Sequence, residues 1–419
     1  MEELLKKYFK GDRIIWFVII ALSIMSMLVI YSATGNLAVR HSSGSAVYFL
    51  FRHAIFLSIG IGLIVAIHNV PYKWFSRVSF LLLAIAVVML IIALKSGTNL
   101  NDAKRWITLP IVGITFQPSE FAKIALMIYL AKALAIHQQE KITLRIYLKH
   151  MLLPVGIVTG LIFTEDLSTA ILIGGASMIM MFIGRVPFKY LFYTVLIAFG
   201  AFLLILVMSR FLSDHTSLFH RVDTWRIRIL AFTGPGHNWL NDSVRFVLGN
   251  GGSSIDSSTS NFQASKSQLA IVNGGFFGQG PGNSLQRYFL PHPYSDFVFA
   301  IIVEEFGMFG GFLVLLAYMV LLYRAGVIVR VSNKVFPALL VIGLTITLVL
   351  QALVNMGVAV GLFPVTGQTL PLVSMGGTSI LFSCLALGMI LSVSRYVKEN
   401  KEMPAETKTS GNDKNESTN

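Results

Sequence analysis

The chain has 419 residues, of which 55% are hydrophobic and only 13% are charged, and its formal net charge is +13 at pH 7. Its mean hydropathy of +0.71 excludes a soluble globular protein, because a domain of this length has no core large enough to bury so many apolar residues. The single cysteine, Cys384, excludes an intramolecular disulfide.

Apolar stretches long enough to cross a hydrocarbon layer of about 30 Å recur along the chain. We predict ten membrane-spanning helices, of which the fifth and sixth are short: 14–34, 54–70, 78–94, 121–136, 151–164, 168–184, 190–208, 297–323, 335–358 and 378–393. The predicted fold class is therefore an all-α polytopic membrane protein with about ten transmembrane helices and one large extracytoplasmic loop.

The distribution of Lys and Arg predicts the orientation of these helices. Every segment that falls on the side of the N-terminus carries basic residues, as cytoplasmic loops do. The tail contains almost nothing apolar to bury and is predicted to be disordered. The expected organisation is a cytoplasmic N-terminus (1–13), helices one to seven (14–208), a large extracytoplasmic loop (209–296), helices eight to ten (297–396) and a disordered cytoplasmic tail (397–419).

The second outer loop contains NDAKRWITLP, where Lys104 and Arg105 break this charge rule beside Trp106. Arg can hold phosphate oxygens with two parallel hydrogen bonds, and Lys supplies a point charge. The pattern predicts either a binding site for an anionic ligand or a cluster that snorkels to the membrane surface.

The next helix begins with QPSEFAK, in which Glu120 and Lys123 are three residues apart and share one helix face. Charged residues within a membrane face the protein interior. We expect either a structural ion pair or part of a polar cavity. Glu165 and Asp166, between two short helices, are interpreted as a solvated acidic turn near the outer face.

The predicted outer loop 209–296 begins with alternating arginines and apolar residues around 221–230, typical of an amphipathic helix that lies on a membrane. A glycine-rich segment follows at 273–291, whose backbone can approach a ligand closely. This segment contains Gln286 and Arg287, which place a cation shortly before the acidic residue at the end of the loop.

That acidic residue is Asp296, which follows Ser295 and precedes the apolar run FVFAIIV. A carboxylate at the boundary between a polar loop and an apolar helix is suited to accept a proton, and it is equally suited to cap the helix. Glu304 and Glu305 follow inside the predicted helix, where carboxylates are usually paired or face a cavity.

The uncharged outer loop at 359–377 contains several Pro and Gly residues. Irregular backbone at this depth is tolerated only where it is buried or lines a cavity. No nucleotide-binding, metalloprotease or serine-hydrolase motif occurs in the sequence.

Four segments, taken together, resemble the SEDS family over residues 31–395: NDAKRWI, QPSEFAK, GGFFGQGPGNSLQRYFLPHPYSDFVFAIIVEEFG and NMGVAVGLFPVTGQTLPLVSMGGTS. The resemblance implies a ten-helix peptidoglycan glycosyltransferase of the bacterial inner membrane. It also implies that lipid II, the undecaprenyl-pyrophosphoryl disaccharide pentapeptide, is the substrate and that a class B penicillin-binding protein is the partner. The opening KGDRIIWF resembles the cell-division branch, which implies a septal location and other division proteins as partners, more than the elongation branch.

By motif, the family's essential acid falls on Asp296, where relatives read HTDF and this chain reads YSDF. The family's basic and aromatic loop residues fall on Arg105 and Trp106, and its paired charges fall on Glu120 and Lys123. The chain departs from the family pattern at NDAKRW, where relatives often read NGARRW, and at EDLSTA, where they read PDLGTA.

The expected chemistry is transfer of a sugar from a lipid pyrophosphate, with Asp296 as general base. The candidate substrate-binding residues are Lys104, Arg105, Trp106, Glu120, Lys123, Gln286, Arg287 and Ser295. A divalent cation, Mg or Mn, on the pyrophosphate is the candidate cofactor, without a dedicated protein site, and no nucleic acid is expected as a partner. The alternatives are a flippase for the same lipid and a noncatalytic division scaffold. A flippase predicts charges through the bilayer midplane, whereas here they gather toward the outer face.

Overall fold

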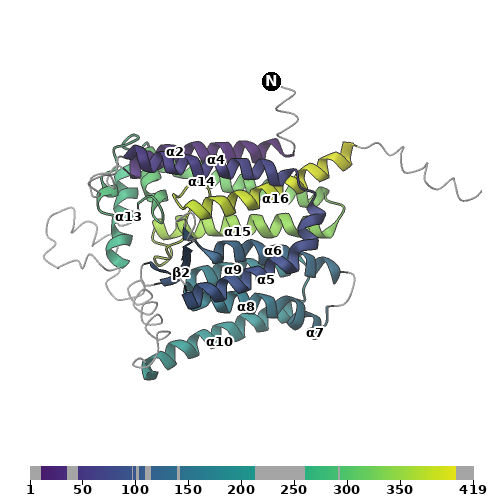
Figure 1. Cartoon of the computed structure of the whole chain (residues 1–419). Coiled ribbons are helices and arrows are strands. Elements are labelled where there is room, and N and C mark those ends of the chain that lie inside the picture. The colour runs from purple at the N-terminus through teal and green to yellow at the C-terminus, as the bar shows by residue number, and fades with distance from the viewer. Residues whose placement is uncertain are drawn as a thin grey trace, which may run out of the picture.

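The computed structural model describes residues 11–34, 46–96, 98–100, 103–108, 115–138, 142–212, 260–290 and 293–402. These residues form a bundle of long helices that run roughly parallel to one another (Figure 1). The helices are α2 (Arg13–Ala33), α4 (Ala46–His68), α5 (Tyr72–Ser96), α6 (Pro118–Ile136), α7 (Leu144–Ile146), α8 (Leu153–Phe163), α9 (Leu167–Ile183), α10 (Phe188–Leu212), α13 (Ser260–Gly274), α14 (Val298–Val331), α15 (Val335–Ala359) and α16 (Gly377–Glu402).

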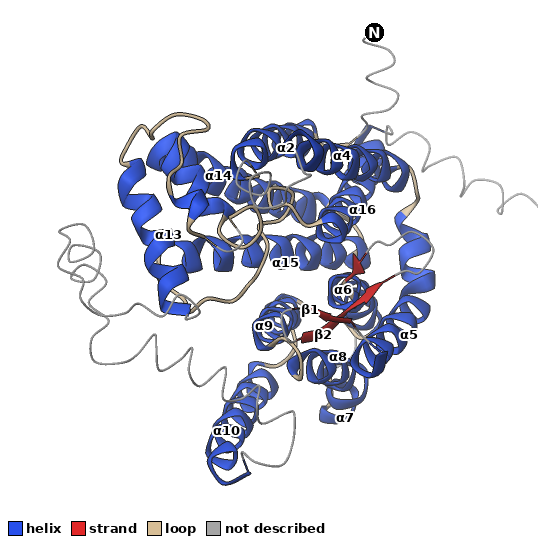
Figure 2. Ribbon diagram, turned by 60° about the vertical axis from the view of Figure 1, so that its left-hand side comes forward, coloured by secondary structure: helices blue, strands red, loops and turns tan. Residues whose placement is uncertain are grey.

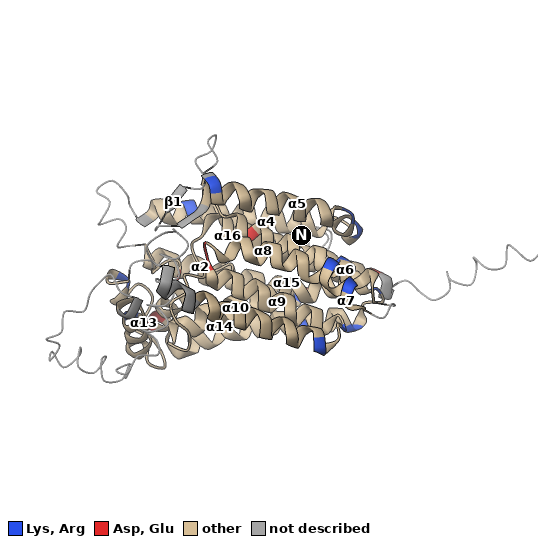
Figure 3. Ribbon diagram, turned by 90° about the horizontal axis from the view of Figure 1, so that it is seen from below, with Lys and Arg blue, Asp and Glu red and all other residues tan. Residues whose placement is uncertain are grey.

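All ten predicted apolar stretches fall on these helices, with α7 and α8 joined through a π-helical segment, Tyr147–Leu152. Within the described residues, eight helical segments are long and apolar enough to cross a membrane, and α9 is a shorter apolar helix. The predicted all-α polytopic membrane architecture is confirmed. Figure 3 shows a charge distribution that fits this architecture. Lys and Arg gather at the two ends of the bundle, and the part between the ends is almost free of them.

The helices differ in how far protein surrounds them, and this decides where polar residues can lie. In its most apolar window α15 is 72% buried, whereas α10 is only 6% buried and stands apart from the bundle in the end-on view (Figure 2). Polar side chains on α15 therefore face neighbouring helices instead of lipid, and α15 can support a polar site inside the membrane.

Helix α14 contains a sharp kink at Gly307, whose φ of 72° and ψ of −177° are not helical. The turn after α13 packs against this kink: the Met308 amide donates to the Gly275 carbonyl at 2.9 Å, and the Gln279 amide donates to the Glu304 carbonyl at 3.0 Å. The single span predicted at 297–323 is thus longer and consists of two segments joined by a glycine, which can adopt the positive φ.

The connections differ from the predicted loops at several places. The segment that contains Lys104 and Arg105 forms a small antiparallel sheet in the order β1 (Thr98–Leu100), β2 (Ala103–Thr108) and β3 (Thr115–Phe116). Part of the large outer loop forms α13, which crosses the end of the bundle (Figure 1), and a 3-10 helix at Gln286–Tyr288. Helix α16 continues to Glu402, past the predicted helix end at 393 and into the tail, 397–419, that was predicted to be disordered. The amphipathic helix predicted around 221–230 lies outside the described residues.

Candidate functional site

Asp296 lies in the turn before α14 and is half-buried. Its Oδ1 atom accepts a hydrogen bond from the Ser295 hydroxyl at 2.7 Å. The N-cap residue of α14 is Phe297, and no side-chain cap bond is found there among the described residues. The capping role that the sequence allowed for Asp296 is therefore wrong, because the helix starts one residue too late for this carboxylate to be its N-cap.

The loop between α15 and α16 packs directly against Asp296. A Cβ atom added to Gly367 would lie 3.6 Å from Oδ2 of the aspartate, so the loop backbone borders the carboxylate. The Ser374 hydroxyl donates to the Ser295 carbonyl at 2.6 Å, and the Met375 amide donates to the Tyr294 carbonyl at 2.8 Å. The irregular loop predicted to be buried or to line a cavity thus forms one wall of the site.

Asn355 on α15 connects the aspartate to this loop. Its side-chain amide donates to the Asp296 carbonyl at 2.8 Å and to the Gln368 carbonyl at 2.6 Å. Gln368 in turn donates to the Thr169 hydroxyl at 2.7 Å, and the Thr169 amide donates to Asp166 at 3.0 Å. A continuous chain of hydrogen bonds therefore runs from the backbone of Asp296 to the start of α9.

Asp166, at the end of this series of hydrogen bonds, differs from the prediction. Asp166 is not a solvated turn residue, because its side chain is buried and it is the N-cap residue of α9. Its carboxylate satisfies a backbone amide at the helix start, which explains why an acid is retained in the turn between two apolar helices.

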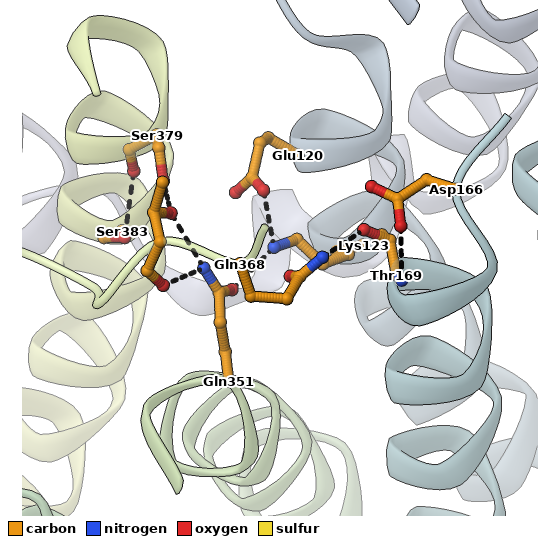
Figure 4. Close-up of polar contacts among 9 residues, drawn as sticks. Glu120, Lys123, Asp166, Thr169, Gln351, Gln368, Ser379 and Ser383 are labelled. Atoms are coloured by element: carbon orange, nitrogen blue, oxygen red, sulfur yellow. Dashed lines mark hydrogen bonds and ion pairs between the residues drawn. The ribbon is translucent and has the colours of Figure 1, made fainter. Parts of the chain in front are cut away.

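A second chain of polar contacts lies one helical turn further along α15 (Figure 4). Lys123 donates to Glu120 at 2.8 Å and to the Gln351 side-chain carbonyl at 2.6 Å. Gln351 donates to the Thr369 carbonyl at 2.9 Å. The predicted pair of Glu120 and Lys123 is thus a buried ion pair that also supports the loop, through Gln351.

These two chains belong to one site, because Gln351 and Asn355 are four residues apart on the same face of α15 and bind neighbouring loop residues, Thr369 and Gln368. Four residues of helix correspond to about 6 Å along the axis. The contacts of Asp296 and those of Lys123 are therefore about one helical turn apart along α15, and the loop between α15 and α16 lies between them.

Arg287 is held by groups of the protein. One guanidinium nitrogen donates to the carbonyl and the hydroxyl of Ser32, at 3.1 and 2.9 Å, and the other donates to the Tyr288 hydroxyl at 2.9 Å. The same Ser32 hydroxyl donates to Glu305, which is buried. The structure thus joins Arg287 to the end of α2, and these contacts compete with a ligand for its guanidinium group.

Glu304 organises the segment that precedes Arg287. Its carboxylate accepts hydrogen bonds from the Ser284 hydroxyl and from the backbone amides of Leu285 and Gln286, at 3.2 and 3.3 Å. Gln286 is itself 5% exposed, so its side chain is not presented to solvent. Both glutamates expected to be paired or to face a cavity are fully buried. Glu304 binds the segment before Arg287, and Glu305 binds Ser32 at the end of α2.

The three remaining predicted residues lie on β2. Trp106 is half-buried and is opposite Thr98 on β1. The side chains of Lys104 and Arg105 lie outside the described residues, although their strand pairs with both β1 and β3. Their proposed contacts with a ligand remain predictions.

The candidate metal ligands that the structure describes are scattered. Among the residues that the structure describes, no group of three or more His, Cys, Asp or Glu side chains could hold a metal ion. A divalent cation at this site would need ligands from the substrate.

Sequence reasoning missed the amides that build the site. Gln351 and Asn355 were visible as two amides spaced four residues apart in an otherwise apolar helix, which is a signal for an interior polar face. Thr169 and Gln368 carried no comparable signal, because their pairing depends on contact between α9 and a loop 199 residues away in sequence.

Solved structures share this fold. A chain of a peptidoglycan synthase complex aligns with a TM-score of 0.66 at 24% identity, covering 92% of this chain and 98% of that one. The rod shape determining protein RodA of Thermus thermophilus aligns with a TM-score of 0.62 at 22% identity, covering 92% and 97%.

Sequence comparison covers the same region. The probable peptidoglycan glycosyltransferase FtsW of Coxiella burnetii is 32% identical over 397 residues, which are 92% of this chain and 96% of the relative. The stage V sporulation protein E of Bacillus subtilis is 31% identical and covers 92% and 97%. Residues 12–399 match the family of FtsW, RodA and SpoVE, described as cell cycle proteins. The chain belongs to this family.

Proposed function

We propose that the protein is a peptidoglycan glycosyltransferase that polymerises lipid II on the outer face of the bacterial inner membrane during cell division. The observation that carries the proposal is the position of Asp296, a half-buried carboxylate at one end of a buried polar network. The name of the relative from Coxiella burnetii supports the reaction, and the description of the family as cell cycle proteins supports the link to cell division.

The proposed reaction is a single inverting displacement. An acceptor sugar hydroxyl attacks the anomeric carbon of the donor, whose bond to the pyrophosphate oxygen breaks, and Asp296 takes the hydroxyl proton. No covalent enzyme intermediate forms, which fits one base instead of the pair of carboxylates that glycoside hydrolases use. The bond from Ser295 to Oδ1 orients the carboxylate, and the border with Gly367 keeps one side of it away from bulk water.

The leaving pyrophosphate needs positive charge nearby. Lys123 is neutralised by Glu120, and Arg287 already donates to Ser32 and Tyr288, so both would have to exchange protein contacts for the ligand. We therefore assign the principal contacts to Lys104 and Arg105 on β2. A divalent cation, Mg or Mn, would reach the site with the lipid pyrophosphate, would add positive charge to stabilise the leaving group, and would need few protein ligands.

The second candidate functions are a lipid II flippase, a noncatalytic division scaffold and, within the family, an elongation enzyme of the RodA type. Among the described residues, the buried Glu120 and Lys123 pair is a charged feature that a flippase could use at depth, but its charges cancel. One assay separates enzyme from flippase and scaffold: purified protein with labelled lipid II in detergent, scored for glycan chains. Chain formation is expected, and protein that moves or binds lipid II without forming glycan would contradict the proposal.

The proposed partner is a class B penicillin-binding protein, because the similar fold occurs in a peptidoglycan synthase complex. We expect the cognate transpeptidase to raise the polymerisation rate and to co-elute with this chain. Depletion of the protein in cells should block septation and yield filaments, whereas rounded cells would favour the elongation role.

A further inference from the structure

A cavity of about 340 Å³ lies at the end of the bundle where α2 begins and α16 ends, on the side away from α13 (Figure 1). It is formed by the start of α2 and by the C-terminal parts of α14 and α16. Arg324, which lines it, lies about seven helical turns along α14 from Val298. The cavity is therefore separated from Asp296 by roughly the length of a membrane-spanning helix.

The start of α2 packs closely against α16 beside this cavity. Gly11 has a φ of +105°, and a Cβ atom added to it would lie 3.2 Å from the Leu391 carbonyl oxygen. The backbone conformation and the close approach both favour glycine at this position. This contact holds the residues that follow Gly11, Asp12 and Arg13, beside the C-terminal part of α16.

A buried carboxylate orients Arg324 at the cavity. Asp12 is the N-cap residue of α2, and its Oδ1 atom accepts from the Ile14 amide at 2.8 Å. Its Oδ2 atom accepts from Nη2 and from Nε of Arg324, the latter at 2.7 Å. Within the described part of the chain, Nη1 of Arg324 makes no hydrogen bond. Since a guanidinium group has five N–H donors, the edge formed by Nη1 and Nη2 remains available for two parallel hydrogen bonds to a phosphate.

Two further cations, Arg13 and Lys398, line the cavity. Both are exposed, and neither forms a salt bridge among the described residues. With Arg324 they outnumber Asp12, the carboxylate among the described lining residues, by two charges. Membrane orientation requires basic residues at the cytoplasmic ends of spanning helices, but it does not require three of them, from three helices, to meet around one cavity. The lining is therefore complementary to an anion.

The remaining wall of the cavity is mainly apolar. Val327, Ile328 and Val331 lie on one face of α14, and Val397 of α16 adds to it. A small soluble anion gains nothing from such a wall, whereas the glycerol and the first acyl carbons of a lipid are removed from water there. Basic pockets between spanning helices are typical sites for the headgroups of anionic lipids.

We propose that this cavity binds the headgroup of an anionic membrane phospholipid. Arg324 donates two hydrogen bonds to the phosphate, and Val327 and Val331 pack against the glycerol and the first acyl carbons. Arg13 and Lys398 attract the phosphate and repel the ammonium group of a zwitterionic headgroup, which favours phosphatidylglycerol over phosphatidylethanolamine. The bound lipid bridges α2, α14 and α16. This site is separate from the one proposed for sugar transfer and does not depend on that function.

Two variants test the charges and the shape of the site separately. The double variant Arg13→Gln with Lys398→Gln removes two exposed cations and leaves the pair of Asp12 and Arg324 intact, so the protein should fold normally. Val327→Phe fills the cavity and keeps every charge.

Lys189→Gln is the matched control for the loss of charge. Lys189 is exposed at the start of α10, directly after the end of α9, and it does not line the cavity. Since α9 begins at Asp166 in the network that reaches Asp296, its far end lies at the same end of the bundle as the cavity. This variant therefore removes a cation from the same membrane surface without changing the proposed site.

Binding would be measured by native mass spectrometry of the whole chain in a neutral detergent, with dioleoylphosphatidylglycerol, dioleoylphosphatidylethanolamine and sn-glycerol 3-phosphate as probes. We expect phosphatidylglycerol to bind at least about tenfold more tightly than phosphatidylethanolamine. The double variant should weaken phosphatidylglycerol binding about 25-fold, because each cation near a lipid phosphate contributes about fivefold. Val327→Phe should weaken it about tenfold or more, and Lys189→Gln should leave it unchanged. Glycerol 3-phosphate should bind at least about a hundredfold more weakly than the lipid, since it buries no acyl carbons.

Equal affinity of the wild type for the two lipids would overturn the proposal, and so would wild-type binding of phosphatidylglycerol by either cavity variant. An equal loss in Lys189→Gln and in the double variant would show a general attraction of basic residues to anionic lipid and would also overturn it. Binding of glycerol 3-phosphate as tightly as phosphatidylglycerol would identify a site for a free anion instead of a lipid. Unfolding temperatures measured without added lipid confirm that the variants are folded before the affinities are compared.

Discussion

The side-chain amide of Asn355 donates to the backbone carbonyl of Asp296 at 2.8 Å, so a residue near the C-terminal end of α15, the most buried of the described spanning helices, holds the backbone of the aspartate in place. The second hydrogen of the same amide goes to the Gln368 carbonyl at 2.6 Å. One side chain therefore holds the aspartate turn and the loop that borders it at a constant separation. Positioning of this kind matters because catalysis depends on sub-ångström placement of the base.

Asn355→Asp is expected to lower both activity and stability. The carboxylate has the same shape but cannot donate, so two buried carbonyls lose their donor at about 1–3 kcal/mol each. Thermal unfolding and glycan synthesis on the purified variant measure the two effects. Thr345→Val on the same helix is the control, since the Thr345 hydroxyl is buried without a partner among the described residues. Wild-type behaviour of Asn355→Asp would show that the amide does not position Asp296.

Asp296→Asn is expected to reduce polymerisation by about two to four powers of ten, because the amide cannot accept the proton. Stability should change little, since Asp296 is not the N-cap residue of α14. Asp296→Glu keeps a carboxylate displaced by one methylene, and partial activity is expected. A folded Asp296→Asn protein that binds lipid II and still makes long glycan would remove the aspartate from the mechanism.

The effects of substitutions at Glu120 and at Lys123 on the free energy of unfolding should be strongly non-additive. Glu120→Gln leaves a buried ammonium without its counter-ion, which costs about 3–5 kcal/mol. The double variant Glu120→Gln with Lys123→Met removes both charges and should recover most of that loss. Unfolding midpoints in detergent for the two single variants and the double variant complete the cycle. Additive losses would mean that the ion pair is absent in the folded protein.

Gly307→Ala should prevent correct packing of the kink in α14. The added Cβ would lie 2.2 Å from the Phe276 carbonyl oxygen and 2.6 Å from the Gly278 nitrogen, both backbone atoms, at a φ of +72°. A loss of about 4 kcal/mol or more is expected, measured as yield of monodisperse protein and unfolding temperature. Gly275→Ala is the matched control, because its φ is also positive but the space around it is open. That variant should lose only about 1–2 kcal/mol, and similar losses for both variants would contradict the clash.

Arg105 is predicted to hold the pyrophosphate. Arg105→Ala should reduce lipid II use more than Arg105→Lys, which retains the charge and loses the two parallel hydrogen bonds. Initial rates at varied lipid II concentration, on proteins of equal unfolding temperature, give the comparison. Activity of Arg105→Ala equal to wild type would return this residue to the snorkelling role.

The sequence alone predicted the membrane class, the ten apolar stretches and Asp296 as the candidate general base. These features are local, because a helix that faces lipid must be apolar over about 20 consecutive residues. A carboxylate at the junction of such a run with a polar loop stands out for the same reason. The boundaries were less accurate, since α4 begins at Ala46 and α14 extends to Val331, where flanking residues are mixed in character.

Only the tertiary structure decided which polar groups meet. Arg287 contacts Ser32, 255 positions away in sequence, and Gln368 contacts Thr169, 199 positions away. Neither pairing produces a periodic pattern in the sequence from which it could be predicted. The same applies to Glu304, which binds the preceding loop because Gly307 bends α14 and brings the turn after α13 onto it. In the membrane interior an unpaired polar group costs several kcal/mol. Gln351, Gln368 and Glu304 therefore bind whichever partner the packing of the helices brings within reach.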